Sequence, residues 1–470
     1  MTVYILGGGP AGLAVAHGLN EETQSDFAVI ERAGTLGGLA QTVKWGEHGA
    51  HDLGPHKIFT LDKKLMERVE ALLPATDWLT RDKISAIFMG GHFLPYPPSP
   101  FSLIKVFGYL AFVNMTASYV LARIRSLFLT SQPLTFEEDL KLRVGGALYD
   151  ALFSPIARKL WGEPSRLDVK LARGRVQTPN LLEIIGRLVG IKKKSEFEAL
   201  TFRYPKGGLQ RLWDAIFRRC GQKGRFLLGH TVERIDVVDR RITAIHCRDV
   251  NAASISIPVD PKDYVVSTLP IGLLANIMGS ALSGEAKQLC KDMITLNDLL
   301  LVFLHIDKAS LFSESWVFVP DPDIAFHRIS EQESFDPDMT PRGSIVCCEI
   351  MSNENRPMNV KTDGDLIEMA LKGLADMGYS EYRVVDTRVI RLPRSYPVFR
   401  PGFETALNKV LAEFDVLENF RTIGRQGAFN YIGTLDAMDI GYGFVDWYQE
   451  RTQRPWQVER ERTSHYPVLD

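Results

Sequence analysis

Hydrophobic residues recur along the chain in two different periods, and the change between them predicts an α/β protein. A short apolar run at residues 3–6 is typical of a buried strand, and apolar residues at helical spacing follow it as far as Leu19. A second apolar run at 27–30 completes a strand–helix–strand unit. Sheet-like patterns dominate again between 300 and 401, whereas helical spacing dominates from 135 to 152. Further strand-like runs lie at residues 84–89, 92–94, 230–235, 241–246 and 264–268.

The least polar segment runs from Val106 to Ala122 and contains no charged residue. It is shorter than the ~20 apolar residues that a membrane span needs, and Gly108 is one of several small or polar residues that interrupt it. We therefore expect one helix, buried or partly exposed, within a helical subdomain. The alternative is a weak contact of residues 106–122 with a membrane surface, with Arg123 and Arg125 among the lipid headgroups.

The composition fits a large enzyme with a substantial core. The chain has 470 residues, 45% of them hydrophobic, which predicts two or three domains. A formal net charge of -2 argues against a nucleic-acid partner attracted through its phosphates. The five cysteines show neither C-x-x-C nor His-Cys spacing, so we expect no metal site and a reduced, cytoplasmic protein. No signal peptide precedes the first strand, which agrees with that location.

The first strand–helix–strand unit carries a glycine pattern suited to a dinucleotide. Gly7, Gly9 and Gly12 stand in the register G-x-G-x-x-G directly after the first strand. The first two leave room for a pyrophosphate at the positive end of the helix, and the third allows close packing of helix on strand. Glu31 ends the second strand, where an acid grips a ribose diol. These features in register favour a dinucleotide site over a structural glycine-rich turn.

A second glycine loop distinguishes between dinucleotides. The loop runs from Gly34 to Ala40, and the motif Gly54-Pro55-His56 follows it later in the chain. A site for a nicotinamide dinucleotide has no evident use for this second loop. This arrangement resembles the FAD-binding superfamily of amine oxidases, protoporphyrinogen oxidases, phytoene desaturases and UDP-galactopyranose mutases. The resemblance implies FAD, with the glycine loop along its ribityl and pyrophosphate part and His56 against the isoalloxazine ring. Taken alone, His56 would be interpreted as a loop histidine bonded to the backbone.

The same resemblance implies a set of cofactor contacts. The backbone at Val232 would meet the adenine, and the first amides of a helix beginning at Asp436 would stabilise negative charge on the flavin. The residues that it places at the cofactor are Gly7, Gly9, Pro10, Ala11, Gly12, Glu31, Arg32, Gly38, Leu39, Gly54, Pro55, His56, Val232, Gly424, Asp436, Ala437 and Met438.

Later motifs resemble the UDP-galactopyranose mutases in particular. They are Lys159-x-Trp161, the run from Arg173 to Asn180 around Arg175, Trp316 to Pro320, Phe326 to Arg328, Tyr396-Pro397, and Gly424 to Tyr431. The resemblance implies that Arg175 and Arg425, with Tyr396 and Tyr431, hold the diphosphate of a nucleotide sugar. The chemistry agrees, because a guanidinium fork matches two phosphate oxygens and keeps its charge. The residues implied at the substrate are Arg175, Trp316, Phe318, Arg328, Tyr396, Arg425 and Tyr431, and those implied in catalysis are Arg175, Arg425, His56, Tyr396 and Tyr431.

Other interpretations stay open for several of these residues. A lone arginine such as Arg175 is ordinarily a solvated surface charge, and Trp316 and Phe318 can equally be core aromatics. The chain also has Pro98-Ser99 where the family has Phe-Gln, and Ile156-Ala157 where it has Tyr-Asn. These departures fall where the base and the sugar would be read, so the identity of both remains open.

The predicted architecture is an α/β + α fold. A Rossmann-like discontinuous FAD-binding domain would comprise residues 1–82, 200–275 and 415–455. A helical subdomain at 100–199 would be inserted into it. A mixed β-sheet substrate domain would comprise 83–99 and 276–414.

Three functions remain in competition. The first is an FAD-dependent pyranose/furanose mutase of a nucleoside-diphosphate sugar, in which reduced flavin N5 attacks the anomeric carbon and NAD(P)H or another donor supplies the electrons. The second is an FAD-dependent oxidoreductase of the protoporphyrinogen oxidase or amine oxidase type. The third is a flavoprotein scaffold or membrane-associated binding protein without turnover. The fold cannot separate them, and the oligomeric state stays open.

Overall fold

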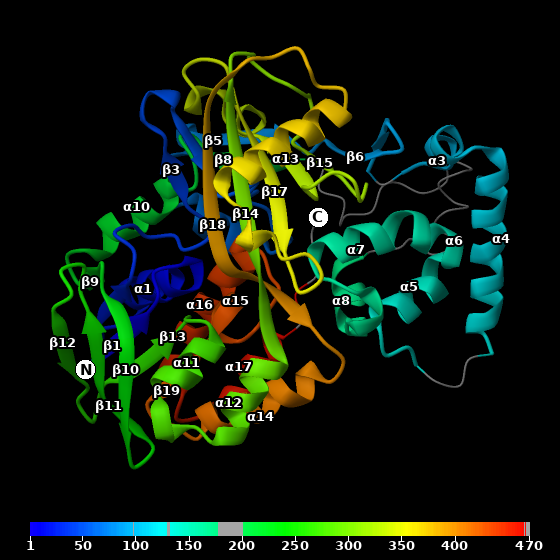
Figure 1. Ribbon diagram of the computed structural model, residues 1–470. Coiled ribbons are helices and arrows are strands. Elements are labelled where there is room, and N and C mark those ends of the chain that lie inside the picture. The colour runs from blue at the N-terminus through cyan, green and yellow to red at the C-terminus, as the bar shows by residue number, and fades with distance from the viewer. Residues whose placement is uncertain (97, 129–131, 177–200, 465, 467–470) are drawn as a thin grey trace.

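The computed structural model describes residues 1–96, 98–128, 132–176, 201–464 and 466. Five parallel strands form one sheet in the order β19-β13-β1-β2-β9 (Figure 1). The apolar runs of β1, β2 and β13 are almost wholly buried because the sheet is covered on both faces. The strands are β1 Thr2–Leu6, β2 Asp26–Glu31, β9 Arg225–Leu228, β13 Tyr264–Ser267 and β19 Phe420–Thr422.

Two helices from opposite ends of the chain pack closely beside this sheet. They are α1 (Pro10–Glu22) and α16 (Thr434–Glu450). A Cβ atom on Gly12 would lie 2.0 Å from the carbonyl oxygen of Gly7, and one on Gly441 would lie 2.3 Å from a carbonyl oxygen of α1. Both positions therefore require glycine, and the contact fixes the first turn of α1 against the C-terminal helix.

A mixed sheet of seven strands forms the second large unit, in the order β18-β14-β17-β16-β15-β6-β7. Only the pair β15–β6 is parallel. Cys347 and Cys348 of β17 are buried in clusters on opposite faces of this sheet, because adjacent residues of a strand point to opposite sides. The strands are β6 Ser85–Met89, β7 His92–Pro95, β14 Ile294–Ile306, β15 Trp316–Phe318, β16 Arg328–Glu331, β17 Ser344–Ser352 and β18 Val384–Phe399.

Smaller elements complete the two units. An antiparallel sheet in the order β10-β11-β12 and the pairs β3–β4 and β5–β8 account for the remaining strands of the described residues. These strands are β3 Thr42–Lys44, β4 Ala50–Asp52, β5 Trp78–Asp82, β8 Thr201–Pro205, β10 Thr231–Val238, β11 Arg241–Arg248 and β12 Ser254–Pro258. The helices are α2 Lys63–Glu70, α10 Gln210–Cys220, α11 Ile271–Ile277, α12 Gly284–Asp292, α13 Asp363–Asp376, α14 Phe403–Asp415, α15 Gly424–Gly427 and α17 Trp456–Arg462.

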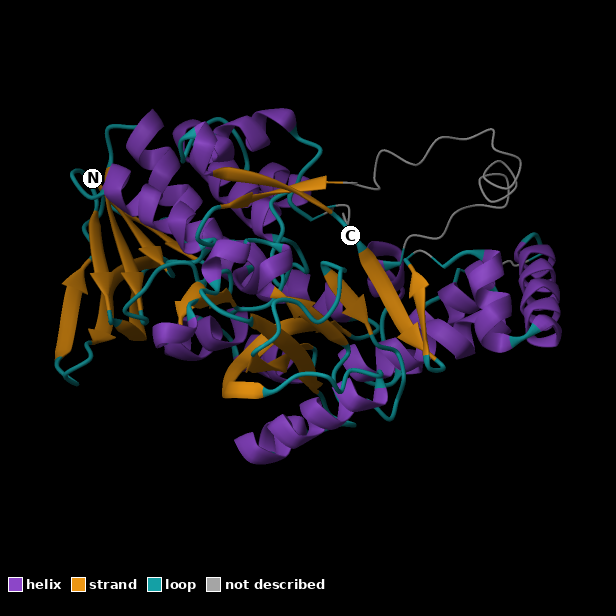
Figure 2. Ribbon diagram, turned by 90° about the horizontal axis from the view of Figure 1, so that it is seen from above, coloured by secondary structure: helices purple, strands orange, loops and turns teal. Residues whose placement is uncertain are grey.

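A group of helices projects from one side of the molecule (Figures 1 and 2). In this group, helix α5 begins with a capping box at Thr135. The Thr135 hydroxyl accepts a bond from the N–H of Glu138, and the Glu138 carboxylate accepts one from the N–H of Thr135. The helices are α3 Pro100–Phe107, α4 Tyr109–Ser126, α5 Phe136–Val144, α6 Gly146–Leu148, α7 Ser154–Leu160 and α8 Val169–Arg175, and a π turn covers Tyr149–Phe153.

The prediction of one helix over 106–122 is wrong in one respect. The chain breaks at Gly108, whose φ of 82° is a left-handed value, so α3 ends and α4 begins in a new direction. Met115 is the only buried residue of α4. Residues 109–122 therefore belong to a partly exposed helix, one of the two forms that the polarity of the segment suggested.

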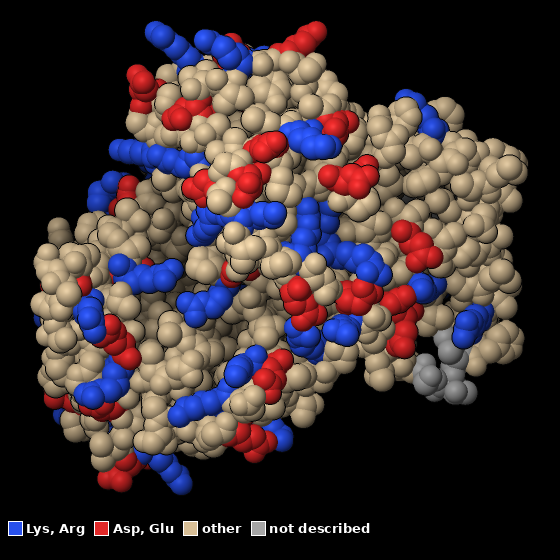
Figure 3. All heavy atoms as spheres, viewed as in Figure 1, with Lys and Arg blue, Asp and Glu red and all other residues tan. Residues whose placement is uncertain are grey.

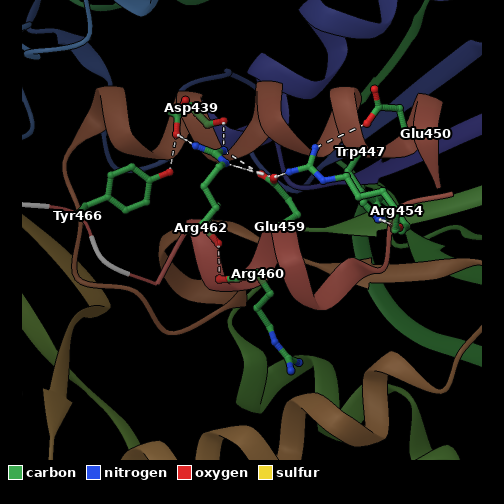
Figure 4. Close-up of polar contacts among 9 residues, drawn as sticks. Asp439, Trp447, Glu450, Arg454, Glu459, Arg460, Arg462 and Tyr466 are labelled. Carbon is green, nitrogen blue, oxygen red and sulfur yellow. Dashed lines mark hydrogen bonds and ion pairs between the residues drawn. The ribbon is translucent and has the colours of Figure 1, made fainter.

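The C-terminal helix α17 is fastened to α16 by a network of ion pairs (Figure 4). The almost fully buried carboxylate of Glu459 accepts bonds from Arg454 at 2.8 Å and from Arg462 at 2.8 Å. Arg462 also bonds Asp439 of α16 at 2.6 Å, and the hydroxyl of Tyr466 donates to the same carboxylate. Tyr466 is thereby held close to the start of α16.

The predicted fold class is confirmed, because a parallel Rossmann-like sheet, a helical group and a mixed sheet are all present. The domain boundaries stay predictions. Within the described residues, no helix is long and apolar enough to cross a membrane.

Candidate functional site

A cavity of about 800 Å³ opens at the carboxyl ends of β1 and β2 and continues to the mixed sheet. Ligands of open parallel sheets bind at this edge. The walls also include residues of β14, β18, α7, α8 and the start of α16. The predicted site residues in the walls are Gly7, Gly9, Pro10, Ala11, Glu31, Arg32, Gly38, Leu39, Gly54, Pro55, His56, Arg175, Val232, Phe318, Arg328, Tyr396, Arg425, Tyr431, Asp436 and Ala437.

Four predicted residues do not reach the walls: Gly12, Trp316, Gly424 and Met438. Gly12 serves the packing of α1, and Met438 is fully buried in the core. Trp316 is 6% exposed and stacks on Phe335, with ring centroids 6.5 Å apart, so it occupies the core.

The first turn of α1 has the shape of a phosphate cradle. A Cβ atom added to Gly9 would meet nothing closer than the Cα atom of Gly38, 3.9 Å away. Gly9 also caps α1 without a side-chain hydrogen bond, and Pro10 occupies the first helical position. The positive end of the helix therefore faces the cavity without a protein side chain at its axis.

Backbone hydrogen bonds hold the Glu31 side chain beside this cradle. Its two carboxylate oxygens accept bonds from the backbone N–H groups of Gly8 at 2.7 Å and Ala33 at 2.8 Å. Each oxygen keeps a further lone pair, so the carboxylate can still receive a ribose hydroxyl.

His56 lies where the Gly54-Pro55-His56 loop enters the cavity. Its Nδ1 atom is 3.0 Å from the carbonyl oxygen of Gly54, as in the backbone-bonded alternative. Burial, together with the positive charges of Arg328 and Arg425, lowers the pKa of His56 to about 4, although the hydrogen bond to Gly54 opposes the shift. His56 is therefore a neutral ring in the cavity wall at physiological pH.

This shift predicts a specific acid sensitivity. The folded-state pKa of His56 lies below its unfolded value, so the unfolded chain binds the proton first as pH falls through 6.5 toward 4. At pH 5 we expect wild-type protein to have lost at most about 2 kcal/mol of unfolding free energy through this residue. His56→Asn should therefore lose less stability than wild type between pH 7 and pH 5 in denaturant titrations. An equal loss in both proteins would contradict the shift.

A buried ion pair lies next to the loop Gly54-Pro55-His56. Arg328 of β16 donates two bonds to Glu349 of β17, from Nε at 2.5 Å and from Nη2 at 2.9 Å. Glu349 is 1% exposed, and its Oε2 atom lies 3.7 Å from the position of a Cβ atom on Gly54. The pair thus forms the floor beneath Gly54.

Replacing Glu349 should be strongly destabilising. In Glu349→Ala the Arg328 guanidinium loses its carboxylate, and breaking such a buried pair typically costs about 3–5 kcal/mol. Urea unfolding measures the loss. Glu354→Ala is the control, because Glu354 is 41% exposed and pairs with Arg400 at 2.8 Å at the surface, where about 1 kcal/mol or less is expected. Equal losses of unfolding free energy in the two variants would show that the Arg328–Glu349 pair does not stabilise the protein more than a surface pair does.

Two arginines and two tyrosines meet at the far wall of the cavity. The Arg175 guanidinium lies 3.4 Å from the ring centroid of Tyr431 and donates to the Tyr431 carbonyl at 2.6 Å. The Arg425 guanidinium lies 5.0 Å from the same ring and 5.2 Å from that of Tyr396. Tyr431 therefore stands between both arginines, and its ring meets that of Tyr396 edge to face at 5.5 Å.

The charge of this cluster is not balanced by carboxylates within the described residues. Neither Arg175 nor Arg425 has an acidic oxygen within 4 Å there, although Asp436 interacts with both at longer range. Burial lowers the pKa of Arg425, and its buried Nε atom has no hydrogen-bond partner among these residues. Two cations in a cavity wall favour an anionic ligand.

Glu349 and Tyr466 are two of the wall residues that sequence reasoning did not assign to the site. Glu349 lies inside the apolar strand β17. The presence of an acidic residue between Cys348 and Ile350 was the only sequence feature that could have indicated a functional position. The ion pairs of α17 place Tyr466 at the cavity wall, and no local sequence pattern predicts that position. The run predicted around Arg175 is described only to Val176, and residues 177–180 of it lie outside the described residues.

Comparisons with known proteins agree with this fold. Residues 5–72 match the model of the NAD(P)-binding Rossmann-like domain. A crystal structure of reduced UDP-galactopyranose mutase superposes with a TM-score of 0.83 at 20% identity, covering 97% of this chain and 95% of that one. The chain has the fold of UDP-galactopyranose mutase. The predicted resemblance is thus confirmed at the level of fold.

Other enzymes share the fold less closely. Cyclohexylamine oxidase from Brevibacterium oxydans IH-35A has a TM-score of 0.66 at 16% identity, with 96% of this chain and 99% of that chain covered. A fatty acid isomerase from P. acnes has a TM-score of 0.63 at 13% identity, with 95% and 98% covered. Likenesses at such low identity describe architecture, so activity must be inferred from the site.

Proposed function

We propose that this protein is an FAD-dependent enzyme that interconverts pyranose and furanose forms of a nucleoside-diphosphate sugar. The observation that carries the proposal is the convergence of Arg175 and Arg425 on the ring of Tyr431 in one cavity wall. A diphosphate matches the two cations in charge and offers the oxygens that guanidinium groups bind in pairs.

The residues at the opposite end of the cavity fit FAD. Gly9 leaves open the space that a pyrophosphate needs, and Glu31 stands where a ribose is gripped. Gly38 and Leu39 also line the cavity, and Asp436 and Ala437 lie in the first turn of α16. When bound and reduced by NAD(P)H or another donor, FAD would supply the nucleophile for the anomeric carbon.

The protein residues then have distinct tasks. Arg175 and Arg425 would hold the diphosphate and offset its charge while its bond to the sugar breaks and reforms. Tyr396 and Tyr431 would donate hydroxyl hydrogen bonds to the same group, and Tyr431 keeps both guanidinium groups in place. Neutral His56 would pack against the flavin ring without adding a charge. No side-chain nucleophile is required.

The proposal is tested with purified protein whose flavin is chemically reduced. A panel of nucleoside-diphosphate pyranoses and furanoses is incubated with it, and products are separated by chromatography while the flavin spectrum is recorded. We expect interconversion of ring forms without net oxidation. A panel that gives no conversion with fully reduced, flavin-loaded protein would reject the mutase.

An oxidase is the second candidate, and an apolar part of the cavity wall favours it. Ile87, Leu152, Phe153 and Ile156 all line the cavity and suit an apolar or amine substrate. Sustained oxygen consumption with such a compound, with no need for prior reduction, would support this candidate instead.

A further inference from the structure

The outer side of helices α3 and α4 exposes apolar side chains to solvent. Its most exposed members, which we call the hairpin face, are 66–85% exposed: Phe101, Tyr109, Leu110, Leu121, Leu127 and Phe128. Patches of this kind on a soluble domain mark a binding surface.

The exposed residues follow one side of α4. Leu110, Val113, Ala117, Leu121 and Ile124 recur at intervals of three and four residues, which places them on one stripe of the helix. All five are exposed, whereas an ordinary surface helix turns such a stripe toward the core.

The opposite side of α4 is fixed to the rest of the protein. A Cβ atom on Gly145 would lie 2.6 Å from the backbone nitrogen of Tyr119, so the two segments touch through their backbones. The hydroxyl of Ser118 accepts a bond from the N–H of Ala147 at 3.2 Å, and Met115 is buried. The hairpin face therefore points outward because the helix is anchored on its other side.

The charged residues of α3 and α4 themselves are all basic. Between Asp82 and Glu137 the sequence contains no acidic residue, while Lys105, Arg123 and Arg125 are all exposed. Figure 3 shows the surface over α4, at the right edge, as uncharged along most of its length with basic side chains toward its lower end. Apolar residues flanked by basic ones are suited to an anionic lipid surface.

We propose that the hairpin face docks on the surface of a lipid bilayer that contains anionic headgroups. The helices would lie in the interface, with Leu110 and Leu121 among the acyl chains and with Arg123 and Arg125 at the phosphates. The described residues contain no helix able to cross a membrane, so the attachment is peripheral.

A second copy of the chain fits this face less well. In a two-fold contact the same patch meets itself, so the basic residues of both copies would share one interface without acids to balance them. An anionic bilayer removes that repulsion.

Docking would bring one wall of the cavity close to the bilayer. Leu103 and Val106 on the inner side of α3 pack in one cluster with Ile87, Phe153 and Phe318, and these three also line the cavity.

Flotation with vesicles tests the docking. Full-length protein is mixed with phosphatidylcholine vesicles prepared with and without phosphatidylglycerol and is then centrifuged through a density gradient. We expect wild type to float with the anionic vesicles, less so at high salt. Leu110→Glu/Leu121→Glu should stay at the bottom, and Arg123→Ala/Arg125→Ala should bind roughly 30-fold more weakly, because each basic residue near an anionic surface contributes about fivefold.

The control variant carries two apolar-to-glutamate substitutions at exposed positions outside the hairpin face. Val238 at the end of β10 and Val250 in the turn between β11 and β12 are both exposed. This sheet lies on the other side of the molecule in Figure 1, so Val238→Glu/Val250→Glu should float like wild type. The docking is refuted if wild type ignores anionic vesicles, or if Leu110→Glu/Leu121→Glu floats equally well. It is also refuted if sedimentation shows a wild-type dimer that this variant abolishes while lipid has no effect.

Discussion

Replacing Arg425 by Ala is expected to lower kcat/KM for the diphosphate-linked sugar by roughly 30- to 5000-fold, a loss of about 2–5 kcal/mol in transition-state binding. Arg175→Ala should have an effect of the same order. Each variant removes one of the two guanidinium groups that flank Tyr431, and the remaining one cannot offset the diphosphate alone. Steady-state kinetics with reduced flavin provides the measurement.

Arg421 provides the matched control for this experiment. It too is an arginine that donates to backbone carbonyls, at Leu417 and Phe420, and its guanidinium lies 5.1 Å from the Trp447 ring. It does not line the cavity. Arg421→Ala should therefore lower stability and leave kcat/KM nearly unchanged. If Arg421→Ala reduces kcat/KM as much as Arg425→Ala, a general loss of structure explains both, and the diphosphate site is wrong.

Gly9→Ala should produce a folded protein that binds FAD about 10- to 100-fold more weakly. The backbone at Gly9 has φ of -79°, which alanine adopts freely, and the nearest atom to the new methyl group is 3.9 Å away. The methyl group would instead occupy the space of the pyrophosphate, and overpacking of this size typically costs about 1–3 kcal/mol. Flavin titration by fluorescence gives the affinity, and thermal unfolding without flavin should match wild type.

Gly12→Ala separates packing from binding in the same loop. Its methyl group would collide with the Gly7 carbonyl at 2.0 Å, so we expect loss of folded protein rather than selective loss of flavin. If Gly9→Ala and Gly12→Ala behave alike, the cradle at Gly9 has no separate role in binding.

Residues near the first glycine motif were the most predictable part of the site. The sequence places Gly7, Gly9 and Glu31 next to their strands, and the structure brings all three to the cavity because the local unit fixes their positions. Local pattern sufficed because each contact spans a single strand–helix–strand unit.

Longer-range features were not predictable in the same way. Trp316 and Phe318 point to one side of a strand, yet only Phe318 reaches the cavity, because Phe335 from a distant turn covers Trp316. Glu349 gains its place from a pairing with Arg328 across two strands, and Tyr466 from the ion pairs of α17. Such positions depend on tertiary contacts that no short pattern records.

The packing of α1 on α16 has a consequence for how the protein is made. The first glycine loop leaves the ribosome early, but α16, which supports it, is encoded more than 400 residues later, and β19 of the same sheet is almost as distant. Contacts of such sequence separation form slowly, since a long loop must close before they can contribute. Truncated chains that lack α16 should therefore fail to load flavin. Cofactor insertion would be a late event of biosynthesis, after α16 has been synthesised.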